Sequence, residues 1–188
     1  MAIEFVIPTH KRPEFLMCSI NSIMVQTNPN WFIHVITDHI DDAYLKIKDF
    51  YKDNTKIKFS EKEFEINLWG HAARNYGIAE AKEEWLVMTG DDNYYTPNFV
   101  ESFLKNVTDE TIFVWCDMIH NAFSYKYVNS RPVVDRIDIG NFMIRTKNAK
   151  QMSLNVINPK ADGVFAEEYL KKFTGKAIYI QSALYVHN

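Results

Sequence analysis

The chain has 188 residues, of which 47% are hydrophobic and 24% are charged, and its formal net charge at pH 7 is −3. This composition and length are typical of one folded globular domain and exclude a disordered, collagen-like or coiled-coil protein. The slight negative charge provides no positive field that would attract nucleic acid, so we expect no nucleic-acid partner.

The first half of the chain alternates short apolar stretches with helical patterns. The sequence predicts strands at residues 3–7, 32–37, 56–59 and 85–88, and helices that begin at Pro13 or span residues 41–51 and 71–82. In the first of these helices, Leu16, Ile20 and Ile23 fall on one face. Strands and helices in this alternating order indicate a parallel sheet with right-handed crossovers.

A further helix is predicted after the fourth strand, with Thr96 as its N-cap and Pro97 at its first position. Beyond residue 111 the pattern becomes irregular, apart from one late helix at residues 164–173. We therefore expect one domain over residues 1–188. Its regular half (1–110) should bind a nucleotide, and its irregular half (111–188) should complete the site.

Nothing in the sequence predicts a membrane segment or a disulfide framework. The longest clearly apolar run, residues 112–116, is far below the ~20 residues that span a bilayer. The apolar stretch at the N-terminus is too short for a signal peptide. Cys18 and Cys116 lie far apart in the sequence and form no CxxC pair. These features predict a soluble, cytoplasmic protein without a transmembrane segment.

Polar residues follow three of the predicted strands, at the edge where open α/β sheets bind ligands. The first strand is followed by a basic loop that includes Arg12, the second by Asp38, and the fourth by an acidic cluster that includes Asp91 and Asp92. Because two adjacent carboxylates repel each other, a buried pair favours a neutralising cation, and Mg²⁺ or Mn²⁺ bridging a diphosphate suits such ligands. The alternative is a solvated acidic turn that caps the next helix.

Four segments in order resemble glycosyltransferase family 2, namely residues 7–13 (IPTHKRP), 35–38 (VITD), 73–78 (ARNYGI) and 85–97 (WLVMTGDDNYYTP). This resemblance implies the α/β GT-A fold, a Rossmann-like and mostly parallel central sheet flanked by helices. It also implies that the nucleotide is bound by a group of residues in the first half, with Asp38 at the base or ribose. The group comprises Pro8, Thr9, Arg12, Asp38, Arg74, Asp91 and Asp92.

The acidic segment resembles a variant of the family's metal-binding motif, but Gly90 stands where that variant has its first aspartate. Asp92 aligns with the acid that touches the metal most directly, and Asp91 is next to it. The resemblance implies His187 as a third metal ligand, although a terminal histidine without a role is the alternative. An imidazole among oxygen ligands favours Mn²⁺ somewhat over Mg²⁺.

The second half carries two less specific resemblances. Residues 139–145 are similar to a segment that lines the acceptor and donor-sugar pocket, and residues 161–165 to the segment that bears the catalytic carboxylate, here Asp162. Asp162 alone would also suit a helix N-cap. Glu167 and Glu168 are competing candidates for the catalytic acid. Trp69, Tyr94, Tyr95 and Trp115 offer aromatic surfaces on which a sugar could stack.

The resemblance implies a metal-dependent, inverting glycosyltransferase of the hexosyltransferase type. It would transfer a sugar from a nucleotide-sugar, with UDP favoured over GDP and dTDP, to a hydroxyl of a glycan or glycoprotein, and Asp162 would accept the proton. A non-catalytic nucleotide-sugar-binding module is one alternative, favoured by Gly90 and by the short chain. A nucleotidyltransferase is less favoured, because no glycine-rich phosphate loop precedes Gly70. The short length also leaves room for further domains in a longer polypeptide.

Overall fold

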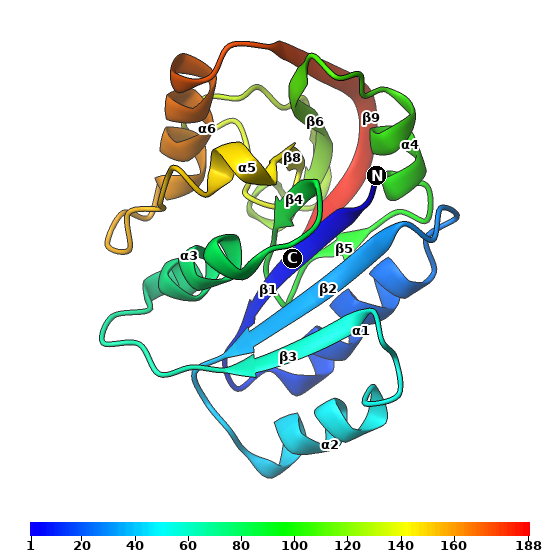
Figure 1. The fold of residues 1–188 in the computed structure, drawn as a ribbon, viewed down its shortest axis with the longest axis vertical. Coiled ribbons are helices and arrows are strands. Elements are labelled where there is room, and N and C mark those ends of the chain that lie inside the picture. Colours follow the sequence, from blue (N-terminus) through cyan, green and yellow to red (C-terminus); the bar gives the residue numbers. More distant parts are fainter.

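The four strands predicted in the first half form a parallel sheet in a computed structural model that describes residues 1–188 (Figure 1). They are β1 (Ile3–Thr9), β2 (Trp31–Thr37), β3 (Ile57–Glu61) and β4 (Trp85–Met88), in the order β3-β2-β1-β4. Every residue of β1 and β4 is buried. These strands are near-continuous apolar runs because helices cover both faces of a parallel sheet.

Three crossover helices connect these strands, namely α1 (Pro13–Met24), α2 (Asp42–Phe50) and α3 (His71–Glu80). The predicted apolar face of α1 is confirmed, since Leu16, Ile20 and Ile23 are all buried. Asp41 caps α2 by accepting a hydrogen bond from the Tyr44 N–H. No helix of the structure is long and apolar enough to cross a membrane. Cys18 is exposed and Cys116 buried, and both are free thiols.

The prediction that Thr96 caps the next helix is wrong. Helix α4 (Phe99–Lys105) begins two residues after Pro97, with Asn98 at the N-cap position. The Thr96 N–H donates to the carbonyl of Leu184, and the Pro97 carbonyl accepts from the Thr27 N–H. Long-range backbone pairing therefore engages both residues, and the helix begins only after a turn at residues 97–98.

The second half extends the same sheet rather than forming a separate one. Its strands are β5 (Tyr94–Tyr95), β6 (Thr111–His120), β7 (Lys126–Val128), β8 (Phe142–Arg145) and β9 (Lys176–His187). They continue the order as β4-β8-β6-β9-β5, with β7 on β6, in one nine-stranded sheet. Strand β8 is antiparallel to both of its neighbours, whereas β9 is parallel to β6. The halves are thus joined through the β4–β8 pair.

Two apolar clusters pack on the two faces of this sheet. One gathers side chains of α1, α2 and α4, and the other those of α3 and of two later helices, α5 (Thr146–Ala149) and α6 (Ala161–Lys172). Figure 1 shows α3, α5 and α6 together on the side of the sheet opposite α1 and α2. The short 3-10 helices η1 (Leu68–Gly70) and η2 (Asn121–Phe123) lie in connections. Helix α6 begins three residues earlier than predicted, which brings Asp162 into its first turn.

Gly77 lies where α3 touches the sheet. A Cβ at this position would come within 2.4 Å of a Val6 methyl carbon and 2.9 Å of the Ile36 Cδ1. Alanine in place of glycine normally stabilises a helix interior by about 1 kcal/mol. We expect the reverse for Gly77→Ala, a loss of about 1–3 kcal/mol in the free energy of unfolding, because the added methyl overpacks the core. Urea denaturation measures it, with the exposed position Glu80→Ala as the control on the same helix. A stabilised Gly77→Ala variant would contradict the close packing.

Candidate active site

A single cleft of about 870 Å³ opens beyond the carboxyl ends of β1, β2 and β4. All nine residues predicted for the site line it, namely Pro8, Thr9, Arg12, Asp38, Arg74, Asp91, Asp92, Asp162 and His187. His120 and Asp138 line it as well and were not predicted. Both halves of the chain therefore contribute to one cleft, which lies where they meet.

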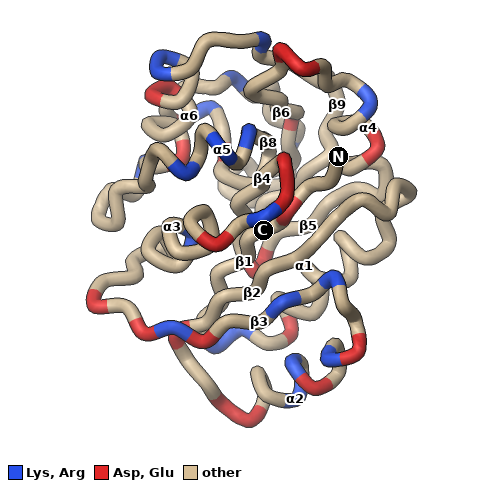
Figure 2. The backbone as a smooth tube through the Cα atoms, viewed as in Figure 1, with Lys and Arg blue, Asp and Glu red and all other residues tan.

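The lining of the cleft carries more negative than positive charge. It contains six carboxylates and three permanent cations, which are Asp38, Asp91, Asp92, Asp135, Asp138 and Asp162 against Arg12, Arg74 and Lys160. Elsewhere the charges are interspersed along the chain, as Figure 2 shows. A phosphorylated ligand that entered the cleft alone would meet net repulsion, so the cleft favours an anion that arrives with a cation.

The acidic turn after β4 is not a solvated turn. Asp91 is only 1% exposed, and its Oδ2 accepts a 2.8 Å hydrogen bond from the Thr9 hydroxyl. Arg12 donates to the Asp92 Oδ2 at 2.5 Å and lies 3.5 Å from the Asp91 Oδ1. Burial raises the pKa of Asp91, while the Thr9 hydrogen bond and the Arg12 charge oppose that rise. In this state Arg12 offsets one of the two negative charges.

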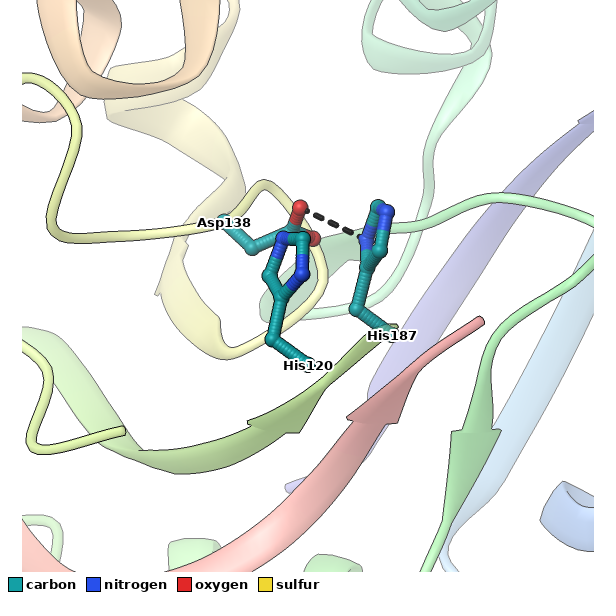
Figure 3. A group of neighbouring side chains, drawn as sticks. All are labelled: His120, Asp138 and His187. Carbon is teal, nitrogen blue, oxygen red and sulfur yellow. Dashed lines mark ion pairs between the residues drawn. The ribbon is translucent and has the colours of Figure 1, made fainter. Parts of the chain in front are cut away.

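His187 lies beside the acidic turn through strand pairing. Tyr94 pairs with Val186, and the Asn188 N–H donates to the Asn93 Oδ1 at 3.4 Å. The His187 side chain is nevertheless turned toward the second half of the cleft. Its Nδ1 lies 2.9 Å from the Asp138 Oδ2, without an aligned hydrogen bond (Figure 3).

His120 completes a cluster with these two residues. It pairs with His187 in the parallel β6–β9 register, and the two rings stack with centroids 4.1 Å apart and planes 15° apart. The ligand atoms of His120, Asp138 and His187 lie within 4.8 Å of one another. Because nearly parallel rings direct their nitrogen lone pairs side by side, and because the His120 Nδ1 accepts from the Ala122 N–H, the lone pairs do not converge on one ion. The cluster is an ion pair with a second ring stacked on it.

Asp138 is held ionised in this cluster. Although burial raises its pKa, the His187 ion pair, the Tyr185 hydroxyl at 2.5 Å and the Gly140 N–H at 3.0 Å lower it to about 2. Burial lowers the pKa of His187, but the contact with Asp138 outweighs it and the net direction is upward.

The one signal for Asp138 in the sequence was its place directly before the segment at residues 139–145. For His120 there was none, since its partners come from distant strands.

Asp162 projects into the cleft from the first turn of α6. The N-cap interpretation of Asp162 is wrong, because the cap position is Lys160, which makes no side-chain capping bond. Burial, and next the negative charge of Asp138, raise the pKa of Asp162 to about 7. Of the competing acids, Glu167 accepts from the Val134 N–H and Glu168 is exposed, and neither lines the cleft. Asp162 is therefore the carboxyl best suited to exchange a proton near neutral pH.

Asp38, predicted to contact the base or ribose, is held by Asn67, a residue that the sequence analysis did not single out. Asn67 donates to the Asp38 Oδ2 at 2.8 Å, and the His10 Nδ1 lies 2.6 Å from the Asp38 Oδ1. Burial raises the pKa of Asp38, but these two contacts outweigh it and lower the pKa. Asp38 is thus an oriented, ionised acceptor.

Arg74 lines the cleft as predicted, and backbone carbonyls accept hydrogen bonds from much of its guanidinium. It donates to the Thr89 carbonyl at 3.1 and 2.9 Å and to the Trp69 carbonyl at 2.5 Å. Arg145, at the end of the predicted pocket segment, lies outside the cleft, over the Trp85 ring. Ile139, at the start of that segment, does line the cleft.

Comparison with known proteins identifies the family of the chain. The family model for glycosyl transferase family 2 matches residues 4–157. YwdF, an uncharacterized glycosyltransferase of Bacillus subtilis (strain 168), is 28% identical over 133 residues, which cover 71% of this chain and 48% of YwdF. The chain spans less than half the length of the curated relatives it matches.

Two solved structures share the fold at low sequence identity. S. aureus TarS 1–349 in complex with UDP has a TM-score of 0.82 at 16% identity, covering 99% of this chain and 60% of that one. The mannosyltransferase PcManGT from Pyrobaculum calidifontis, in complex with GDP-Man and Mn²⁺, has a TM-score of 0.74 at 13% identity, covering 98% and 56%. The predicted α/β GT-A fold is confirmed, and, with the family model matching most of its length, the chain belongs to glycosyltransferase family 2.

Proposed function

We propose that the chain is a metal-dependent, inverting glycosyltransferase that transfers a sugar from a UDP-sugar to a hydroxyl of a glycan or glycoprotein. The observation that carries the proposal is one cleft that holds both an acidic turn, for a metal and diphosphate, and Asp162, a carboxyl with a pKa near 7. TarS in complex with UDP or UDP-GlcNAc shares the fold and supports UDP as the nucleotide. PcManGT in complex with GDP-Man and Mn²⁺ shares the fold as well and supports a nucleotide-sugar that binds together with a metal ion.

The donor set of the cleft fits a hard divalent cation. Two adjacent carboxylates, Asp91 and Asp92, have Arg12 as their one cationic partner, and His187, which lines the same cleft, would leave its contact with Asp138 to join them. In the proposal these three residues hold Mn²⁺ or Mg²⁺. The bound ion supplies positive charge that stabilises the departing nucleoside diphosphate.

The first half of the cleft would hold the nucleotide. Asp38 accepts hydrogen bonds from the base or ribose, and Pro8 and Thr9 form the floor beside it. The Arg12 side chain is 49% exposed, so it can leave Asp92 and pair with a phosphate when a metal ion takes over the carboxylates. Arg74 keeps the surrounding backbone in place through its carbonyl contacts.

Asp162 would act as the general base. It takes the proton of the acceptor hydroxyl as that oxygen bonds to the anomeric carbon, and the bond from this carbon to the diphosphate oxygen breaks. The electron pair leaves with the diphosphate, and the proton ends on Asp162. A single displacement of this kind inverts the anomeric centre.

Thermal unfolding with UDP or GDP, each with Mn²⁺ or with EDTA, tests the donor site. At a hundred times the dissociation constant a ligand adds about 2.7 kcal/mol, so we expect UDP with Mn²⁺ to raise the midpoint by roughly 5–10 °C. Asp92→Asn should lose the Mn²⁺-dependent part of this shift. Asp135→Asn removes another carboxylate of the same cleft and is the matched control. A UDP shift that is the same in EDTA would contradict metal dependence.

Turnover of UDP-sugars separates an enzyme from a binding module. Asp162→Asn should bind UDP with Mn²⁺ like the wild type but lose about 10²–10⁴-fold in turnover, because the general base is gone. Wild-type activity should fall as the pH drops below about 7, where Asp162 becomes protonated. Binding of UDP without turnover of any UDP-sugar would favour the non-catalytic module.

The raised pKa of Asp162 also predicts a pH-dependent stability difference. In the folded state Asp162 holds its proton up to about pH 7, whereas the ordinary value is 3.8, so its contribution to stability is lost as the pH rises between these values. Asp162→Asn carries no such proton. We expect the variant to gain stability relative to the wild type from about pH 4 upward, with a plateau above about pH 7. Chemical denaturation at several pH values measures this, and a difference independent of pH would contradict the raised pKa.

A further inference from the structure

Trp69 differs from the other three tryptophans of the chain in its exposure. It is 54% exposed and lines the cleft, whereas Trp31 and Trp85 are buried and Trp115 stacks on Tyr179 outside the cleft. An exposed indole does not contribute the stabilising free energy that its burial in the core would give. Its place on the wall of the cleft indicates that a ligand covers it.

The backbone at Trp69 is strained. Its φ is +53°, in the left-handed region, and that of Gly70 is +75°. Such a conformation suits glycine or asparagine and is rare for a bulky aromatic residue. Strain of this kind persists when the surroundings fix the backbone, and it occurs preferentially at ligand sites. The local chain geometry therefore does not account for a tryptophan at this position.

Three contacts hold the Trp69 loop against the nucleotide side of the cleft. The Trp69 carbonyl accepts from Arg74, and Gly70 packs so closely on Pro8 that a Cβ would lie 2.8 Å from the proline ring. Two residues earlier, Asn67 donates to Asp38 and accepts from the Ala73 N–H at 3.1 Å. The backbone that carries the indole is thereby fixed relative to Asp38, and the Trp69 and His71 ring centroids lie 5.9 Å apart.

We propose that Trp69 is a stacking platform for the nucleobase of the bound nucleotide. This inference rests on the proposed function. The transferred sugar lies beyond the diphosphate, toward Asp92 and Asp162, so the part of the donor next to Asp38 and the Trp69 loop is the nucleoside. An indole face suits a planar base, and stacking of this kind tolerates different bases. Trp69 thus contributes affinity, while Asp38 reads the hydrogen-bonding groups of the base.

Tryptophan fluorescence tests this directly, because Trp69 is the exposed tryptophan of the cleft. UDP with Mn²⁺ should quench the wild-type emission and also that of Trp115→Phe, the control that removes a tryptophan outside the cleft. In Trp69→Phe the quenching should disappear while calorimetry still finds most of the UDP affinity. In Trp69→Gly the affinity for UDP should fall about 5- to 150-fold. Inorganic diphosphate with Mn²⁺, which lacks a base, should bind the wild type and Trp69→Gly equally.

The thermal midpoint of the ligand-free protein excludes a merely structural role. Glycine accepts the positive φ, so Trp69→Gly should not lower the midpoint, whereas loss of a structural residue would. If Trp69→Gly fails to fold, Trp69→Phe still tests the proposal, which predicts that this variant loses the quenching and keeps most of the UDP affinity. Unchanged UDP affinity in Trp69→Gly, or quenching that survives in Trp69→Phe, would overturn the platform and leave the proposed function standing. A wild type that binds no nucleotide with either metal would overturn both.

Discussion

The ion pair between Asp138 and His187 sets the electrostatics of the cleft. Asp138 stays ionised because His187, Tyr185 and Gly140 all stabilise its charge, and its pKa is about 2. The charge of Asp138 then adds to burial in raising the pKa of Asp162 to about 7. Two carboxyls in one cleft thus have pKa values on opposite sides of the ordinary value. At neutral pH Asp138 stays charged, whereas Asp162 can gain or lose a proton.

This ion pair depends in turn on the pairing of distant strands. His187 ends β9, which runs parallel to β6 and antiparallel to the short strand β5. The first contact sets His187 against His120, and the second brings it beside the acidic turn. Because β8 lies between β4 and β6, the segment that carries Asp138 reaches the same place. The parallel half of the sheet supplies Asp38 and the acidic turn to the cleft, and the mixed half supplies Asp138, Asp162 and His187.

What the sequence could predict follows from how local each feature is. The strands and crossover helices of the first half are encoded by apolar runs and spacing, as in α1, so their types were predictable and their boundaries nearly so. The Thr96 cap failed because a strand 88 residues away binds that backbone. Asp138 and His120 were not predicted as site residues, because neither belongs to a spacing motif and distant strands bring them together. Arg12 was correctly assigned to the cleft, but its pairing with Asp92 across 80 residues was not visible in the sequence.

Gly90 lies directly against the side chains of the acidic turn. A Cβ at this position would lie 2.8 Å from the Asp92 Oδ1 and 2.9 Å from the Asn93 Nδ2. An aspartate there would have to displace both side chains, which in this chain fold back over the glycine. Of the two acids that remain, Asp91 is buried against Thr9, whereas Asp92 is partly exposed and paired with the half-exposed Arg12. Asp92 is therefore the more accessible of the two carboxylates in the proposed metal site, and the Thr9 hydrogen bond fixes Asp91 next to it.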